Sequence, residues 1–197
     1  MDADAHSAKH DDSSPNPAAG NGGVGTDTRP VDGTRPSGEA RKLLAIYLAD
    51  HHAGSTAGLE LAERAARHNA GNRIGGVLAD VVREIEDDRR TLEHLMDVLD
   101  IPTSPVKRTM ALLAERAARL KLNGHLFTYS PLSRLTELEG LALGILGKLA
   151  LWESLERVPA LQGVGGLDFA QLAERARNQH DAVLECRRQA AELAFST

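Results

Sequence analysis

Apolar residues between positions 74 and 99 recur at alternating spacings of three and four, which predicts an amphipathic helix with one apolar face. The series consists of Ile74, Leu78, Val81, Ile85, Leu92, Leu95 and Leu99. Asp88 occupies the position that completes the series, so a carboxylate is expected in the middle of a face that packs into a core. A buried ionised carboxylate is costly unless it is paired, hydrogen-bonded or bound to a metal. The pattern therefore predicts a helical protein with a polar centre.

Capping and stop signals divide the chain after residue 37 into five predicted helices, at about 39–68, 73–99, 105–123, 131–157 and 169–194. Ser130 before Pro131 is typical of a helix start, and Asp168 with Gln171 forms a capping box. Four of the helices are long, about 40 Å at a rise of 1.5 Å per residue. The shorter third helix would return the chain along the molecule, so that the second and fourth helices run parallel.

A four-helix bundle in which a long crossover joins the second and third core helices is the ferritin-like arrangement. We therefore predict an all-α fold, a ferritin-like four-helix bundle with a helical crossover and five helices in all. An up-and-down five-helix bundle is the alternative. Aromatic residues make up only 3% of the chain, so its core must be built from Leu, Ala, Val and Ile, a composition that favours helices.

Residues 1–37 contain no Leu, Ile, Phe, Tyr or Trp, and they are rich in Asp, Ser, Pro, Gly and Ala. Such a segment cannot bury enough apolar surface to offset the entropy of ordering. We predict a disordered N-terminal tail over 1–37 and a helical bundle domain over 38–197.

The net charge of -5 argues against a nucleic-acid partner, which usually requires a basic surface. The longest strongly apolar run, 141–152, contains Lys148 and is shorter than the roughly 20 residues that a membrane span needs. The first residues lack the basic and apolar regions of a signal peptide. We expect a cytoplasmic protein with no membrane or nucleic-acid partner.

When the long helices are aligned, their midpoints bring a set of polar side chains to one height. These residues are predicted to form the buried polar centre: Asp50, His51, Glu84, Asp88, Lys148, Arg177 and His180. In the last helix, a rotation by one position would place Gln179 where His180 is expected.

Long helices with carboxylates and histidines near their midpoints resemble the ferritin-like superfamily of ferritins, rubrerythrins and di-iron carboxylate oxidases. The segments 47–51 (YLADH), 121–124 (KLNG) and 129–135 (YSPLSRL) also resemble a bacterial group of ferritin-like proteins without a known activity. The superfamily resemblance implies a site for two irons, held by a Glu from each of two helices and a Glu-x-x-His pair from each of the other two.

The chain departs from that ligand pattern, which indicates a degenerate di-metal site. His94 is preceded three residues earlier by Thr91, and His180 by Arg177, so neither forms a Glu-x-x-His pair. Lys148 stands where a carboxylate ligand is expected, and its ammonium would repel a divalent cation.

We therefore expect no cofactor and a network in which Lys148, with Arg177, neutralises Asp50 and Asp88. The alternative is a site for iron or another divalent metal, with ligands drawn from Asp50, His51, Glu84, Asp88, Glu137 and His180.

Small residues line one side of two of the predicted helices, Ala53, Gly54, Ala57 and Gly58 in the first and Gly140, Gly144 and Gly147 in the fourth. A glycine inside a helix costs about 1 kcal/mol relative to alanine. Close approach of two helices is the expected compensation, and room for a ligand or a bulky partner residue is the alternative.

Two functions follow from these features. The first is a non-catalytic ferritin-like bundle that acts as a binding or interaction module. Its apolar edge within 106–120 is usable for packing, for association with a second copy, or for a helical protein partner. The second is a metal-dependent, di-iron-type oxidase or peroxide-handling protein with unusual ligands. Whether the chain is an enzyme stays open at this point.

Overall fold

The computed structural model describes residues 38–103 and 129–196, and within these ranges it contains four long α-helices and no strand. The helices are α1 (Gly38–His68), α2 (Arg73–Val98), α4 (Pro131–Glu156) and α5 (Phe169–Phe195), and two short 3-10 helices, Pro159–Leu161 and Val164–Gly166, join α4 to α5. The prediction of an all-helical chain is confirmed for these ranges, with four helices where five were predicted. The predicted tail, the third helix and its apolar edge lie outside the described residues.

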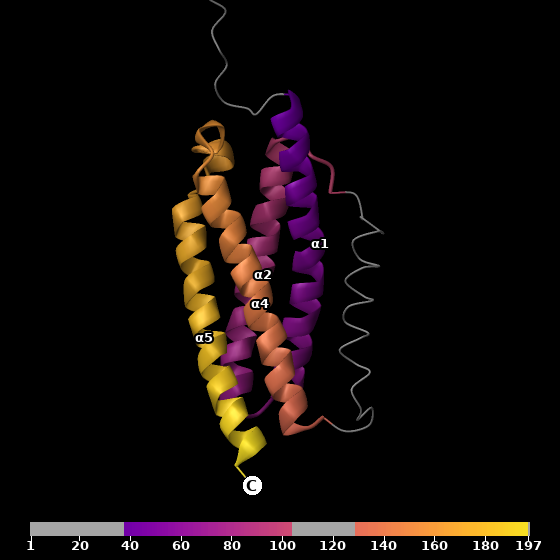
Figure 1. Ribbon diagram of the computed structural model, residues 1–197, viewed down its shortest axis with the longest axis vertical. Helices are drawn as coiled ribbons and strands as arrows, with labels where there is room; N and C mark the ends of the chain where they lie inside the picture. The colour runs from indigo at the N-terminus through magenta and orange to yellow at the C-terminus, as the bar shows by residue number, and fades with distance from the viewer. Residues whose placement is uncertain (1–37, 104–128, 197) are drawn as a thin grey trace, which may run out of the picture. The chain divides into compact units, whose positions relative to one another are not determined.

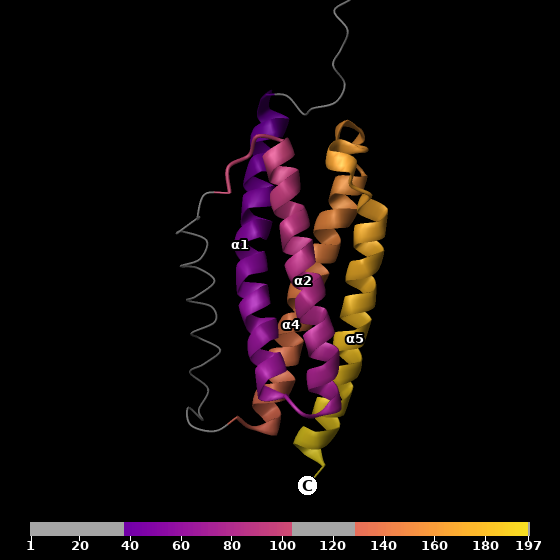
Figure 2. The ribbon, with the colours of Figure 1, turned by 180° about the vertical axis from the view of Figure 1, so that it is seen from behind.

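The four helices lie side by side with α1 and α5 running in one direction and α2 and α4 in the other (Figures 1 and 2). Helices α1 and α5 each pack against both α2 and α4. Helix α2 ends at the upper end of the bundle in Figure 1, and α4 begins at the lower end. The parallel direction of α2 and α4 agrees with the sequence-based expectation. No helix in the described ranges combines the length and apolar character needed to cross a membrane.

Side chains define the starts of three helices. Asn72, Ser130 and Asp168 each occupy an N-cap with extended backbone, and each side chain accepts a hydrogen bond from the backbone N–H three residues later, at 3.0, 3.1 and 3.0 Å. An N-cap oxygen satisfies one of the backbone donors that the first turn of a helix leaves without a partner. The predicted starts of the second, fourth and fifth segments therefore have a local physical cause.

The apolar core of the bundle consists of two clusters, one toward each end. The upper cluster includes Leu48, Leu95, Met96, Trp152, Leu155, Phe169 and Ala176, and the lower one includes Ala62, Leu78, Ile85, Leu138, Ile145, Val183 and Ala190. Asp88 on α2, Lys148 on α4 and Gln179 on α5 fall between the two clusters along their helices. A polar layer therefore divides the core near its middle.

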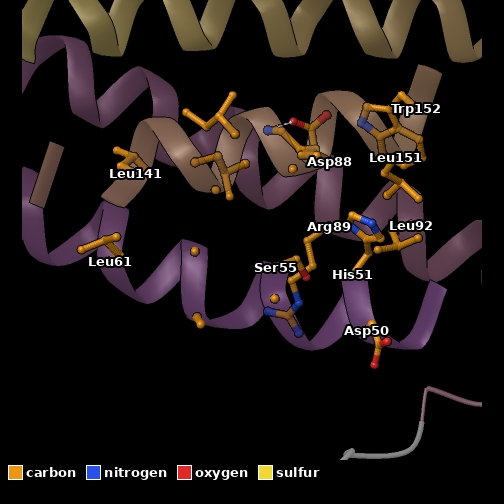
Figure 3. A pocket seen from close by; sticks show the side chains of 18 of the residues that line it. Asp50, His51, Ser55, Leu61, Asp88, Arg89, Leu92, Leu141, Leu151 and Trp152 are labelled. Carbon is orange, nitrogen blue, oxygen red and sulfur yellow. Dashed lines mark hydrogen bonds and ion pairs between the residues drawn. The ribbon is translucent and has the colours of Figure 1, made fainter. Parts of the chain in front are cut away.

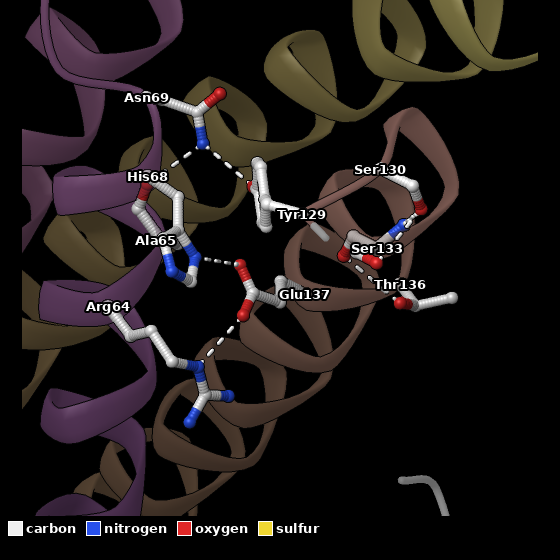
Figure 4. Close-up of polar contacts among 9 residues, drawn as sticks. All are labelled: Arg64, Ala65, His68, Asn69, Tyr129, Ser130, Ser133, Thr136 and Glu137. Carbon is white, nitrogen blue, oxygen red and sulfur yellow. Dashed lines mark hydrogen bonds and ion pairs between the residues drawn. The ribbon is translucent and has the colours of Figure 1, made fainter. Parts of the chain in front are cut away.

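A separate polar network ties α1 to the start of α4 at the lower end of the bundle (Figure 4). Glu137 accepts hydrogen bonds from Arg64 at 2.8 Å and from His68 at 3.4 Å, while buried Asn69 donates to the Tyr129 hydroxyl at 3.1 Å. Glu137 precedes the polar layer on α4 by about 16 Å at a rise of 1.5 Å per residue. Its role in the described structure is to join two helix ends.

Candidate functional site

The carboxylate of Asp88 lies at the centre of the polar layer and uses both of its oxygens. Oδ1 accepts from the guanidinium of Arg175, and Oδ2 accepts from the ammonium of Lys148 and from the side-chain amide of Gln179, the last at 3.1 Å. Lys148 also donates to the amide oxygen of Gln179. Three helices, α2, α4 and α5, thus contribute to one connected cluster, which we call the Asp88 network.

Burial within the Asp88 network falls from its centre outward. The side chain of Asp88 is 2% exposed, that of Lys148 15% and that of Arg175 35%. Burial lowers the pKa of the Lys148 ammonium, and the neighbouring Asp88 carboxylate opposes this shift. Burying an ionised carboxylate costs free energy because it loses its hydration. The two cationic partners and the amide donor of Asp88 offset this cost.

The structure does not bring the α1 residues into this network. Figure 3 shows His51 pointing into the space between α1 and α4, while Asp50 points away from it. Asp50 is exposed, and His51 is half-buried with its ring 4.6 Å from the ring of Tyr47. Burial lowers the pKa of His51, and the charge of Asp50 opposes this shift.

The remaining predicted members lie around the Asp88 network without joining it. Arg177 is on the surface, where it bonds to Glu153 at 2.6 Å and to Glu174 at 3.0 Å. His180 is largely buried, with Nδ1 3.8 Å from the carboxylate of Asp181.

Glu84, another predicted member, is half-buried. It lines a small cavity of about 180 Å³ between α2 and α5, and its charge acts on Lys148. It therefore affects the Asp88 network electrostatically from one side.

Arg175 was not among the predicted residues, and Gln179 was named only as the residue that a rotation by one position would place where His180 was expected. The buried positions of α5 are Phe169, Leu172, Ala173, Ala176, Gln179, Val183, Cys186 and Ala190. Apart from Ala173 they alternate strictly at three and four residues, and this alternation selects position 179 over 180. Arg175 stands beside that stripe, and a long side chain at such a flanking position can reach inward while its stem packs on the helix.

The ligand set expected for a metal does not converge in the described structure. Both oxygens of Asp88 are engaged by cations and an amide, Glu137 lies at the lower end of the bundle, and Asp50 points away from the Asp88 network. Within the two described ranges, no group of three or more His, Cys, Asp or Glu side chains is placed to hold a metal ion. Within residues 38–103 and 129–196, the predicted ligands therefore do not form the ligand set of a di-metal centre.

A cavity of about 570 Å³ lies beside the Asp88 network, between α1, α2 and α4 (Figure 3). Its walls are mainly apolar, with Tyr47, Gly54, Ala57, Gly58, Leu61, Ile85, Leu92, Gly140, Leu141, Gly144, Ile145, Gly147, Leu151 and Trp152 among the lining residues. Asp50, His51, Ser55, Asp88, Arg89 and Lys148 supply its polar groups. Asp88 and Lys148 thus belong both to the network and to the cavity wall.

The helix glycines of α1 and α4 surround this cavity, and four of them do not serve close packing. A methyl group added at Gly54, Gly58, Gly144 or Gly147 would meet no atom within 4 Å. At Gly140 it would meet only the side chain of Leu61, at an ordinary contact distance of 3.4 Å. The expectation of close helix approach is therefore wrong at the four open glycines, and the alternative, space between the helices, describes them.

No family model matches this chain, and no curated protein or solved structure does so either.

Proposed function

We propose that this chain is a non-catalytic binding module with a ferritin-like helix arrangement, and that its binding site is the cavity between α1, α2 and α4. The observation that carries the proposal is the cavity of about 570 Å³ with four glycines facing open space. Ligand sites in proteins are typically concave, mostly apolar and about 300–1,000 Å³ in volume. Helix glycines are costly, so four at one cavity are best explained by the space that they leave.

The chemistry of the Asp88 network supports a role without catalysis. Both oxygens of its carboxylate accept hydrogen bonds within the chain, Oδ1 from Arg175 and Oδ2 from Lys148 and Gln179, so the charge of Asp88 is compensated by two cations and an amide. The network joins α2, α4 and α5 into a fixed wall. The parallel course of α2 and α4, which requires a crossover between them, supports the ferritin-like arrangement.

Binding of the uncharged dye N-phenyl-1-naphthylamine, whose fluorescence rises in apolar surroundings, tests the proposal. The wild-type chain should bind the dye saturably. Gly54→Leu and Gly147→Leu should each weaken binding at least about tenfold, because the new side chain fills volume that the dye needs. Both changes replace a glycine within a helix by a good helix former, so the fold should be kept.

Gly76→Leu is the matched control, because Gly76 is an exposed glycine of α2 outside the cavity with nothing within 4 Å of an added methyl group. It should bind the dye like the wild type. Unsaturable dye binding, or equal affinity in the two cavity variants and the wild type, would contradict the proposal. Purified protein with about two irons per chain would favour the metal-dependent oxidase instead.

A further inference from the structure

Trp152 lies in the wall of the cavity with a hydrogen-bond donor that has no acceptor. Its side chain is 1% exposed, and among the described residues its indole Nε1 is a buried atom without a hydrogen-bond partner. Buried N–H groups in folded proteins are nearly always paired, so an unpaired one at a cavity calls for an explanation. In Figure 3 the indole nitrogen is on the ring edge nearest Asp88, and Trp152 is the last lining residue of α4.

Lys148 adds a second donor close to Trp152. The two residues are four positions apart on α4, so their side chains lie on the same face of the helix. The ammonium of Lys148 donates to Asp88 and to Gln179, and an ammonium carries three N–H groups. The α4 wall of the cavity therefore presents donors, whereas the acceptor oxygens of Asp88 are already engaged.

The charged groups that face the cavity are paired within the chain. Asp50 points away from this space, which leaves the carboxylate of Asp88 and the cationic groups of Arg89 and Lys148. Asp88 is paired with Lys148, and Arg89 is paired with Glu93 at 3.1 Å. An anionic ligand would meet the carboxylate of Asp88, and a cationic one would meet Arg89 and Lys148, so an uncharged molecule suits this lining best.

The cavity is long in relation to its volume. Its lining extends along α1 from Tyr47 to Leu61, about 20 Å at a rise of 1.5 Å per residue. Apolar side chains and glycines dominate over this length, and the polar groups gather toward Asp88. Trp152 is the last lining residue of α4, so an extended apolar chain with its polar group at that end of the cavity matches the lining.

We infer that the ligand of this cavity is an uncharged, extended apolar molecule with a carbonyl or ether oxygen near one end, which accepts a hydrogen bond from Trp152. This inference rests on the proposed function, because it names the class of ligand for the same cavity. In this inference, Trp152 recognises the oxygen of the ligand, and the glycines leave the space that its apolar chain occupies.

Displacement of N-phenyl-1-naphthylamine by matched ten-carbon compounds tests the inference. The ketone 2-decanone should displace the dye at concentrations at least about tenfold lower than decane, which has the same chain but no acceptor. Decanoate and decyltrimethylammonium should compete less well than the ketone. Trp152→Phe should remove the advantage of 2-decanone while leaving displacement by decane within about twofold of the wild type.

Trp152 is the only tryptophan of the chain, so its fluorescence gives a second readout that needs no variant. 2-Decanone should shift its emission, and decane should not. Equal displacement by the ketone and the alkane, or a Trp152→Phe variant that loses both to the same degree, would overturn the inference while the proposed function stands. Absence of saturable dye binding in the wild type would overturn both.

Discussion

Helix α4 packs against α5 and against α1, and small residues have opposite roles at the two interfaces. On the α5 side, Ala173 and Ala176 are at most 1% exposed and belong to the same cluster as Trp152 and Leu155. On the α1 side, Gly54 and Gly147 border a cavity of about 570 Å³. Alanine completes a tight interface, whereas glycine preserves an open one, although both appear in the sequence as small residues on a helix face.

The two interfaces also differ in how their polar groups are satisfied. Toward α5, Lys148 and Asp88 have partners in Gln179 and Arg175. Trp152 stacks on Phe169 of α5 and also lines the cavity beside α1, and its indole N–H has no acceptor among the described residues. At the first interface, Asp88 and Lys148 have partners within the chain, and the Nε of Arg175 is a buried donor without one in the described part of the chain. At the second interface, the donor without a partner lies in the wall of a cavity.

Loss of the Asp88 carboxylate should have the largest effect on the closed interface. Asp88→Ala should lower the free energy of unfolding by about 3–5 kcal/mol, because Lys148 would be left buried without its counter-ion. Urea denaturation followed by circular dichroism measures this loss. Asp87→Ala is the matched control, since Asp87 is exposed and its pair with Arg90 lies on the surface, and its midpoint should match the wild type. If Asp88→Ala changed the free energy of unfolding as little as Asp87→Ala, the Asp88 network would not stabilise the fold.

Lys148→Met should cost less, about 3 kcal/mol, because Asp88 keeps Arg175 and Gln179 as partners. The double variant Lys148→Met with Asp88→Leu should recover much of that loss, since no buried charge is then left opposite an apolar side chain, and Arg175 can reach water. A double-mutant cycle in urea measures the coupling. Additive losses would show that the two side chains do not act as a pair.

The positions of these partners could be predicted from the sequence only in part. Asp88 is flanked on both sides by regularly spaced apolar residues, so its burial followed from local periodicity. In α5 the same reasoning allowed both Gln179 and His180, and the strict alternation through Cys186 and Ala190 distinguishes them. Arg175 could not be predicted this way, because a long side chain on the flank can point inward or outward with the same spacing.

The cavity could not be predicted from helix periodicity at all. Gly54 and Gly147 indicate a short side chain at the interface, but the distance between two helices depends on every residue that packs across it. Leu61 contacts the added methyl position at Gly140, whereas no side chain does so at the four open glycines. Space of this kind is a property of the pair of helices and appears only in three dimensions.

Replacing a small residue by a larger one should change stability differently at the two interfaces. Ala176→Leu should destabilise the protein by about 1–3 kcal/mol, because Ala176 is fully buried and extra carbon atoms would strain a packed core. Gly144→Leu adds the same side chain at an open position, and it should be neutral or stabilise the protein by up to about 1 kcal/mol through helix propensity. Thermal unfolding of the two variants provides the comparison. Equal destabilisation would mean that the α1–α4 interface is as closed as the α4–α5 interface.

The smallest expected effect is a pH dependence of stability at the open interface. Burial lowers the pKa of His51 from an ordinary value of 6.5, so the unfolded chain binds a proton there at a higher pH than the folded chain does. Stability due to this group is complete above about pH 6.5 and decreases as the pH falls toward the lowered value. Asp50 opposes the shift, and Arg89 lines the same cavity.

His51→Gln tests this dependence, because glutamine keeps a polar side chain but cannot take up the proton. Between about pH 7.5 and 5.5, the melting temperature of the variant should change less with pH than that of the wild type. Glu93 has a lowered pKa whose ordinary value is 4.5, so its contribution falls below this window. Parallel curves for the two proteins would show that His51 is solvated as well in the folded chain as in the unfolded one, and the space beside α1 would then be an aqueous cleft.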